Sequence, residues 1–456
     1  MPNGISLISY FLINDHIMSA ITAQNTIEFL KQFIRADGFD LVVDLQKSSG
    51  NKLYDARAKE FYLDCCAYFA SNPIGHNHPK LFTKDFEEKL LRVARAKPSN
   101  SDFYTIEYAQ FVDTIHRVAM PEYFKHLFFI EGGALGVENA LKAAFDWKIR
   151  KNWKNGIKEE KGKQIIHFKE AFHGRTGYTV SLTNTADPRK TKLFTKFSWP
   201  RITNPKLIFP LDEKNLSLVK ELEGQALYEI KSAFEEHGND IAAIIIEPIQ
   251  GEGGDNHFRK EFLQMLRKVS DENDVMLIFD EVQSGVGITG TMWAYEHFDV
   301  QPDIICFGKK MQVCGLMAGG KVDEVDNNVF KESSRINSTW GGNLTDMVRA
   351  QRYLEVIEED KLVDNARVVG DKLLKELESL AQKFPHVISN ARGRGLMCAI
   401  DFPNQEKRDL IQKALFKRKL IVLKCGDRSI RFRPALTFSV EEVQEVVAML
   451  QDVVRE

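Results

Sequence analysis

Five short apolar segments of this sequence each end directly at glycine or polar residues, and no other feature constrains the fold as strongly. Continuous runs of Val, Ile, Leu and Phe of this length predict parallel strands that are buried on both faces. Helical patterns lie between them, for example at Val137, Ala140, Leu141, Ala144 and Phe145. The repeat therefore predicts an α/β fold with a single, mostly parallel sheet whose carboxyl edge gathers the polar residues. The five segments are residues 127–130, 165–168, 241–246, 275–279 and 304–307.

The pattern of predicted elements changes after Gly341 and Gly342, where strict alternation of strands and helices stops. Strands and helices without alternation are typical of a small α+β domain. Helices are expected at 344–384 and about 440–454, and strands at 397–400, 420–423 and 430–432. Near the amino terminus, residues 27–33 are amphipathic, and residues 41–43 and 61–63 are strand-like.

We therefore expect three parts in the 456 residues, which are 43% hydrophobic and can bury a large core. Residues 1–70 would form an N-terminal segment that joins the small domain. Residues 71–343 would form the large domain, and residues 344–456 the C-terminal small domain.

Composition excludes several classes of function. A net charge of −2 with both signs interspersed gives no electrostatic case for nucleic acid or an anionic membrane. The six cysteines lack metal-ligand spacing, so we expect no metal and a reduced, cytoplasmic protein. No apolar run reaches the ~20 residues of a membrane helix, and the apolar residues 5–13 have no basic segment before them. The histidines at 76 and 78 predict a turn whose imidazoles cap or line a pocket.

Asp280 and Lys309 are the strongest candidates for chemistry, because each lies at or just after the carboxyl end of a predicted strand. They are 309 − 280 = 29 residues apart, which leaves room for a crossover helix between neighbouring strands. Ligands bind at this edge of open α/β sheets. A desolvated lysine is a nucleophile toward a carbonyl carbon, and an aldehyde cofactor such as pyridoxal phosphate also needs an acid beside its ring nitrogen. A structural Asp–Lys ion pair is the alternative.

Two glycine-rich stretches have to be weighed as phosphate sites. Gly285, Gly287 and Gly290 match G-x-G-x-x-G, but they do not follow the strand directly, and an acidic strand end would repel a pyrophosphate. Gly133 and Ala134 are the better candidates, because they lie between a strand and a helix whose N-terminus attracts anions. A plain tight turn would explain them equally well.

Six ordered motifs then resemble the class III (ornithine-type) aminotransferases, which are pyridoxal phosphate-dependent enzymes of fold type I. The resemblance extends from about residue 40 to 450 and implies that fold, that cofactor and a homodimer with shared active sites. The motifs are GGALGVENALKAAF, AFHGRT, EPIQGEGG, FDEVQSG, FGKK and NSTWGGN.

The resemblance assigns cofactor roles by position. Lys309 would form the Schiff base and move the proton, Asp280 would pair with the ring nitrogen, and Gln283 would bind the phenolic oxygen. The remaining predicted cofactor contacts are Phe172 and His173 on the ring face, Gly133 and Ala134 at the phosphate, and Ser338 and Thr339 from the neighbouring subunit. Many relatives have Ser-Gly-Thr at residues 132–134, so phosphate binding here would depend more on main chain and Thr339.

Within the family, the motifs most resemble lysine 6-aminotransferases, which implies transfer of the ε-amino group of L-lysine to 2-oxoglutarate. Arg175 would bind a substrate carboxylate, with Asn337 as a weaker candidate. Glu252 would neutralise Arg431 when lysine is bound and move aside for 2-oxoglutarate; Arg433 is the rival for the Arg431 role. Ornithine, 4-aminobutyrate and acetylornithine remain alternative donors, and a racemase or mutase of the same fold is a further alternative.

Overall fold

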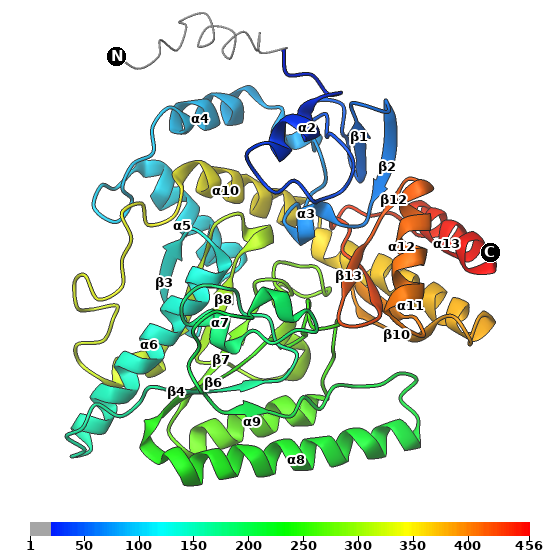
Figure 1. Ribbon diagram of the computed structural model, residues 1–456. Helices are drawn as coiled ribbons and strands as arrows, with labels where there is room; N and C mark the ends of the chain where they lie inside the picture. Colours follow the sequence, from blue (N-terminus) through cyan, green and yellow to red (C-terminus); the bar gives the residue numbers. More distant parts are fainter. Residues whose placement is uncertain (1–19) are drawn as a thin grey trace, which may run out of the picture.

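A computed structural model describes residues 20–456, and its centre is a seven-stranded sheet (Figure 1). All five predicted strands belong to this sheet and run in the same direction, which confirms the mostly parallel arrangement. Within the described residues, β9 is the antiparallel member of the sheet, and it lies between β3 and β8. The order is β3 (Phe124–Ile130), β9 (Cys314–Gly319), β8 (Ile304–Phe307), β7 (Met276–Asp280), β6 (Ile241–Ile246), β4 (Gln164–Phe168) and β5 (Arg201–Ile202).

Helices cover both faces of the sheet, which explains why its strands are continuously apolar. In β6, Ile245 packs into the cluster formed with α6 (Gly133–Lys154), whereas Ile244 and Ile246 pack with α9 (Lys260–Glu272) on the other face. Successive strand residues point to opposite faces, so a strand covered on both sides is apolar throughout. The other helices of this part are α4 (Lys84–Ala94), α5 (Ile106–Val118), α7 (Thr179–Leu182) and α8 (Glu213–His237), with 3-10 helices at Pro79–Leu81, Pro188–Lys190, Gly238–Asp240, Ala294–Phe298, Lys309–Met311 and Gly320–Glu324.

The connection between β7 and β8 differs from our expectation, because it contains the 3-10 helix Ala294–Phe298 and loops rather than a crossover α-helix. A buried carboxylate organises this connection. The Glu281 side chain accepts hydrogen bonds from the main-chain N–H groups of Ala294 (3.0 Å) and Tyr295 (2.8 Å), and from the Ser284 hydroxyl (2.7 Å). Side-chain acceptors therefore replace part of the main-chain bonding that a helix would supply.

The C-terminal part forms a four-stranded antiparallel sheet of order β10-β11-β14-β13. The expected strand at 420–423 is divided, because β12 pairs with β2 near the amino terminus while β13 pairs with β14. Residues 41–43 do not form the expected strand; only Val43 makes an isolated bridge, to Asp55. The elements are β10 (Ser389–Arg394), β11 (Met397–Asp401), β12 (Leu420–Ile421), β13 (Leu423–Cys425), β14 (Ser429–Phe432), α10 (Leu344–Glu359), α11 (Leu362–Lys383), α12 (Gln405–Lys417) and α13 (Val440–Arg455).

The N-terminal strands lie beside the C-terminal part in Figure 1 and share the sheet β1-β2-β12 with it. This pairing supports an N-terminal segment that joins the small domain, but the boundaries at residues 70 and 343 stay a prediction. The N-terminal elements are α2 (Thr26–Lys31), β1 (Lys52–Asp55), β2 (Glu60–Asp64) and α3 (Ala67–Ala70).

The turn with the two histidines has the predicted character. His76 Nε2 lies 3.0 Å from Oδ2 of the buried Asp64, and His78 Nδ1 accepts a hydrogen bond from the Lys80 N–H (3.4 Å) at the start of a 3-10 helix. Both histidines line a surface hollow.

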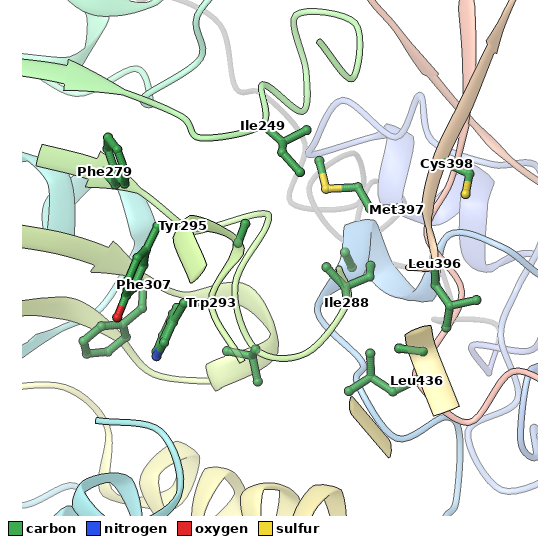
Figure 2. Close-up of a cluster of buried hydrophobic side chains, with 14 of the residues drawn as sticks. Ile249, Phe279, Ile288, Trp293, Tyr295, Phe307, Leu396, Met397, Cys398 and Leu436 are labelled. Atoms are coloured by element: carbon green, nitrogen blue, oxygen red, sulfur yellow. The ribbon is translucent and has the colours of Figure 1, made fainter. Parts of the chain in front are cut away.

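One buried apolar cluster joins the large sheet to the C-terminal part (Figure 2). It extends from Phe279 and Phe307 at the carboxyl ends of strands through Trp293 and Ile288 to Leu396. The polar edge of the sheet is therefore held against the C-terminal part by apolar packing. The apolar residues 5–13 lie outside the described residues, and none of the helices in residues 20–456 has the length and hydropathy to cross a membrane.

Candidate active site

Asp280 and Lys309 line the same narrow cavity at the carboxyl edge of the sheet. Asp280 is the last residue of β7, and Lys309 follows the paired strand β8 after one glycine. The open volume of the cavity is about 50 Å³. The lining residues are Gly133, Ala134, Val137, Phe172, His173, Gly174, Glu247, Asp280, Val282, Gln283 and Lys309.

A larger hollow of about 840 Å³ lies beside Tyr123, Asp303 and Gly320. Asp303 precedes β8, so this hollow opens at the amino ends of the parallel strands. Ligands of open α/β sheets bind at the opposite edge, and the cavity around Lys309 is therefore the candidate active site.

Two neighbours orient the Asp280 carboxylate. His173 Nδ1 lies 2.8 Å from Oδ2, and the Val282 N–H donates to Oδ1 over 3.0 Å. His173 and Asp280 are both buried, and His173 Nε2 has no hydrogen-bond partner among residues 20–456. A carboxylate held in one orientation is suited to pair with a cationic ring nitrogen.

Lys309 combines a strained main chain with a perturbed amine. Its φ of +47° lies in the left-handed region, which side-chain-bearing residues rarely adopt and which often marks functional sites. Burial lowers the pKa of its amine, and so does the nearby Arg431 guanidinium, while Asp280, Glu247 and Glu252 act in the opposite direction. A lowered pKa increases the fraction of neutral amine, which is the nucleophilic form.

The N-terminus of α6 forms the end wall of the cavity. Gly132 caps the helix with a φ of +105°, and helical residues begin at Gly133. A Cβ added to Gly174, whose φ is +119°, would lie 2.4 Å from Cβ of Ala134. The loop and the helix can approach this closely only because both residues are small, and the free N–H groups of the first helical turn then face an anion site.

Glu247 is a cavity residue that the sequence reasoning did not identify. Its Oε1 accepts from the Phe172 N–H and its Oε2 from the Gly251 N–H, both at 2.9 Å, so one carboxylate holds two strand-end loops. Burial raises the pKa of the Glu247 carboxyl to about 7, although the two hydrogen bonds and His173 act to lower it. Its position in the sequence could have identified it, because Glu247 directly follows the apolar segment 241–246 just as Asp280 directly follows the segment 275–279.

Arg431, Glu252 and Gln283 form a connected group, although 179 residues separate the first two in sequence. Arg431 donates from Nη2 to Oε2 of Glu252 (2.6 Å) and from Nη1 to Oε1 of Gln283 (2.9 Å). Burial raises the pKa of the Glu252 carboxyl, but Arg431 and Lys190 outweigh it, and the pKa lies below its usual range. The rival Arg433 is fully buried and pairs with Asp255 instead.

Six predicted site residues do not line this cavity. Arg431 and Glu252 are connected to it through Gln283, and the other four do not reach it within the chain. Arg175 is exposed, and so is Asn337, whose Oδ1 accepts from the Ser338 N–H (2.7 Å). Ser338 and Thr339 lie on the same segment, where their carbonyl groups accept from Ser101 and Ser99. The predicted roles of these four residues stay predictions.

The donor set of the cavity fits pyridoxal phosphate. Lys309 would present an amine to an aldehyde, Asp280 would present a carboxylate to a ring nitrogen, and the first turn of α6 would present N–H groups to a phosphate. Phe172 offers an aromatic face. In residues 20–456, no group of three or more His, Cys, Asp or Glu residues is placed to hold a metal ion.

Comparison with known proteins agrees with this assignment. The family model described as Aminotransferase class-III matches residues 34–454. An L-lysine-epsilon aminotransferase from Mycobacterium tuberculosis is 51% identical over 425 residues, covering 93% of this chain and 94% of that protein. One from Streptomyces clavuligerus is 49% identical over 432 residues, covering 94% and 93%. A solved structure described as lysine aminotransferase from M. tuberculosis in the internal aldimine form has a TM-score of 0.93 at 50% identity, covering 95% of this chain and 99% of that one.

Proposed function

This chain belongs to the class-III aminotransferases, and we propose that it transfers the ε-amino group of L-lysine to 2-oxoglutarate. The products would be 2-aminoadipate 6-semialdehyde, which is expected to cyclise, and L-glutamate. The similarity to enzymes named L-lysine-epsilon aminotransferase supports the donor. The structural observation that carries the proposal is the ion pair between Glu252 and Arg431 beside the cavity.

When bound, pyridoxal phosphate supplies an aldehyde carbon that exchanges amines and a ring that accepts electrons. Asp280 would hold the proton on the ring nitrogen, because His173 and Val282 fix the direction of its two oxygens. The Lys309 amine, with its lowered pKa, would move a proton between the substrate carbon that bears nitrogen and the cofactor carbon that receives it. A base with a pKa closer to neutrality performs such transfers better.

The two substrates place different demands on Arg431. Lysine enters with its ε-amine first, so the reacting carbon is bonded to one methylene group and carries no carboxylate, and a bare guanidinium there would be an uncompensated charge. The acceptor 2-oxoglutarate has a carboxylate next to its reacting carbon, and a guanidinium binds this group with two parallel hydrogen bonds. Glu252 would therefore neutralise Arg431 for lysine and leave it for 2-oxoglutarate. Arg175 and Asn337 would bind the distant carboxylate.

The proposal includes a homodimer in which Ser338 and Thr339 of the partner subunit complete the phosphate site. Gly132, Gly133 and Ala134 provide no side-chain hydroxyl to the phosphate, so hydroxyls from elsewhere would complement the main chain. The 337–341 segment packs on residues 99–101, next to Phe103, Tyr104 and Ile106, which are 70%, 80% and 75% exposed. Apolar side chains exposed to this degree around one segment support a contact with a second copy.

A panel of amine donors tests the donor directly. The holoenzyme would be supplied with 2-oxoglutarate and with L-lysine, L-ornithine, 4-aminobutyrate or N-acetylornithine, while glutamate formation is followed. The proposal expects the highest kcat/KM with L-lysine and detection of the semialdehyde. A higher kcat/KM with one of the other three amines would assign the chain to that reaction.

A further inference from the structure

Glu252 contacts two cations, one through each carboxylate oxygen. Oε2 accepts from Nη2 of Arg431, and Oε1 pairs closely with Nζ of Lys190. The Arg431 side chain is 3% exposed, whereas the side chains of Lys190 and Glu252 are 23% and 24% exposed. The carboxylate is therefore shared between a buried cation on the reaction side and an accessible cation on the other.

Two features of the structure hold Lys190 in this position. It ends the 3-10 helix Pro188–Lys190, which is capped by the Asp187 side chain through a hydrogen bond from the Arg189 N–H (3.1 Å). Its Nζ also lies 5.8 Å from the centroid of the Phe172 ring, within cation–π range. These contacts hold the ammonium group near Glu252.

Space for Glu252 exists on the Lys190 side. Lys190 and Glu252 line a cavity of about 500 Å³ together with Arg408, Lys424 and Gly426. None of these five residues lines the narrow cavity around Lys309. The Glu252 side chain can thus rotate away from Arg431 into an open volume whose lining includes further cations.

Separation from Arg431 would ordinarily leave the Glu252 carboxylate without a partner, and a partly buried charge without a partner is strongly unfavourable. Lys190 removes most of this penalty, since Oε1 is already in contact with its ammonium group. Without Lys190, separation would leave Glu252 without the cation that already contacts its second oxygen, and the Arg431 pair would be harder to open.

We propose that Lys190 is a positioning residue that receives the Glu252 carboxylate when Arg431 is released, and that it thereby sets the affinity for the dicarboxylate acceptor. This inference rests on the proposed function, because it assumes alternation between lysine and 2-oxoglutarate. Lys190 acts through Glu252 and does not itself contact substrate.

The test compares Lys190→Met with wild type in two measurements on the holoenzyme. Steady-state kinetics should show KM for 2-oxoglutarate raised about tenfold and KM for L-lysine changed by less than about twofold. Calorimetric titration with glutarate, an unreactive dicarboxylate, should show a Kd about tenfold weaker. Lys190→Arg keeps the cation and should restore both values. Arg189→Met is the matched control, because Arg189 lies on the same helix but bonds Asp187 rather than Glu252.

A double-variant cycle separates positioning from direct binding. In a Glu252→Ala background no carboxylate has to move, so adding Lys190→Met should leave glutarate affinity unchanged. A weakening that persists in that background would overturn the inference, because Lys190 would then bind the dicarboxylate itself. Equal changes in both KM values, or none in either, would also overturn it. The donor panel on wild type judges the proposed function separately, so the two failures are distinguishable.

Discussion

His173 Nδ1 lies 2.8 Å from Oδ2 of Asp280, and both side chains are buried at the carboxyl edge of the sheet. The sequence brings these residues to one place because β4 and β7 end at the same edge, with β6 between them. The carboxylate thus depends on a loop more than 100 residues away for its orientation.

Replacing His173 should weaken cofactor binding while the negative charge of Asp280 is kept. His173→Leu leaves Asp280 with the Val282 N–H as its hydrogen-bond donor. By analogy with metal sites, where loss of a group that orients a ligand typically costs about 10–100-fold in affinity or activity, we expect a loss of that order. We expect the Kd of pyridoxal phosphate, measured by fluorescence titration, and kcat to deteriorate within that range. His173→Asn offers an N–H close to the position of Nδ1 and should lose less. Equal losses in both variants would contradict the orienting role.

Asp280→Asn should separate cofactor binding from catalysis. A carboxylate about 4 Å from a ring cation contributes about 4 kcal/mol at an effective dielectric near 20. Neutralising it should therefore lower kcat about a thousandfold, while absorbance still shows bound cofactor. Asp280→Glu, which retains the charge, is the matched control. Near-normal kcat in Asp280→Asn would assign the ring-nitrogen partner elsewhere.

Arg431 and Arg433 should respond differently to substitution, although only one residue separates them. Arg431→Ala should raise KM for 2-oxoglutarate about a hundredfold, since it removes a charged partner of the acceptor, with less than about a tenfold change for lysine. Arg433→Ala breaks a fully buried pair with Asp255 and should lower the free energy of unfolding by about 3–5 kcal/mol. Urea denaturation measures the second effect. If Arg433→Ala instead raised KM for 2-oxoglutarate and Arg431→Ala lowered the free energy of unfolding, the two arginines would have the opposite roles.

Glu281 predicts a pH dependence of stability. Burial raises its pKa from 4.5 to about 7 in the folded protein, so the folded state binds this proton more tightly than the unfolded state. Its contribution is therefore most favourable below pH 4.5 and is lost as pH rises through 7, by about 3 kcal/mol. The stability difference between wild type and Glu281→Gln should change by this amount in urea denaturation from pH 4.5 to 7.5. The exposed Glu261→Gln should show no such change, and parallel curves for wild type and Glu281→Gln would contradict the assignment.

The exposed apolar residues predict a contact between copies. Tyr104→Glu places a charge on the patch with Phe103 and Ile106 and should shift the protein toward monomer in sedimentation velocity. Because Thr339 of the partner subunit would complete the phosphate site, cofactor affinity should fall with it. Leu193→Glu, at another exposed apolar side chain, is the control. A Tyr104→Glu protein with unchanged mass and cofactor affinity would contradict the proposed interface.

The strands were predictable from sequence where burial on both faces made them continuously apolar. Strand β9 was missed because it is rich in small residues: a Cβ at Gly315 would lie 2.0 Å from the Phe128 carbonyl oxygen, so packing requires glycine where propensity argues against a strand. The division of residues 420–423 between two sheets depends on pairing with β2, which has no local sequence signal.

The site was predictable to the extent that its residues follow strands. Asp280 and Lys309 were predicted because each lies at or just after the end of a strand. The Glu252–Arg431 pair was predicted only through the family resemblance, because no local pattern relates residues so distant in sequence. Lys190 could not be inferred, since its role follows from a short helix brought against Glu252 by tertiary packing. The exposed position of Arg175 likewise depends on how its loop turns after Gly174.

The most direct test of the account is whether Lys309 is the amine that carries the chemistry. Lys309→Ala should be inactive with L-lysine and 2-oxoglutarate and should lose the visible absorbance of cofactor joined to the chain. Lys310→Met is the control, because the adjacent Lys310 is buried, donates to the main-chain carbonyl of Gln283 (2.7 Å) and does not itself line the cavity. That variant should keep the absorbance. Turnover and an unchanged spectrum in Lys309→Ala would contradict the account.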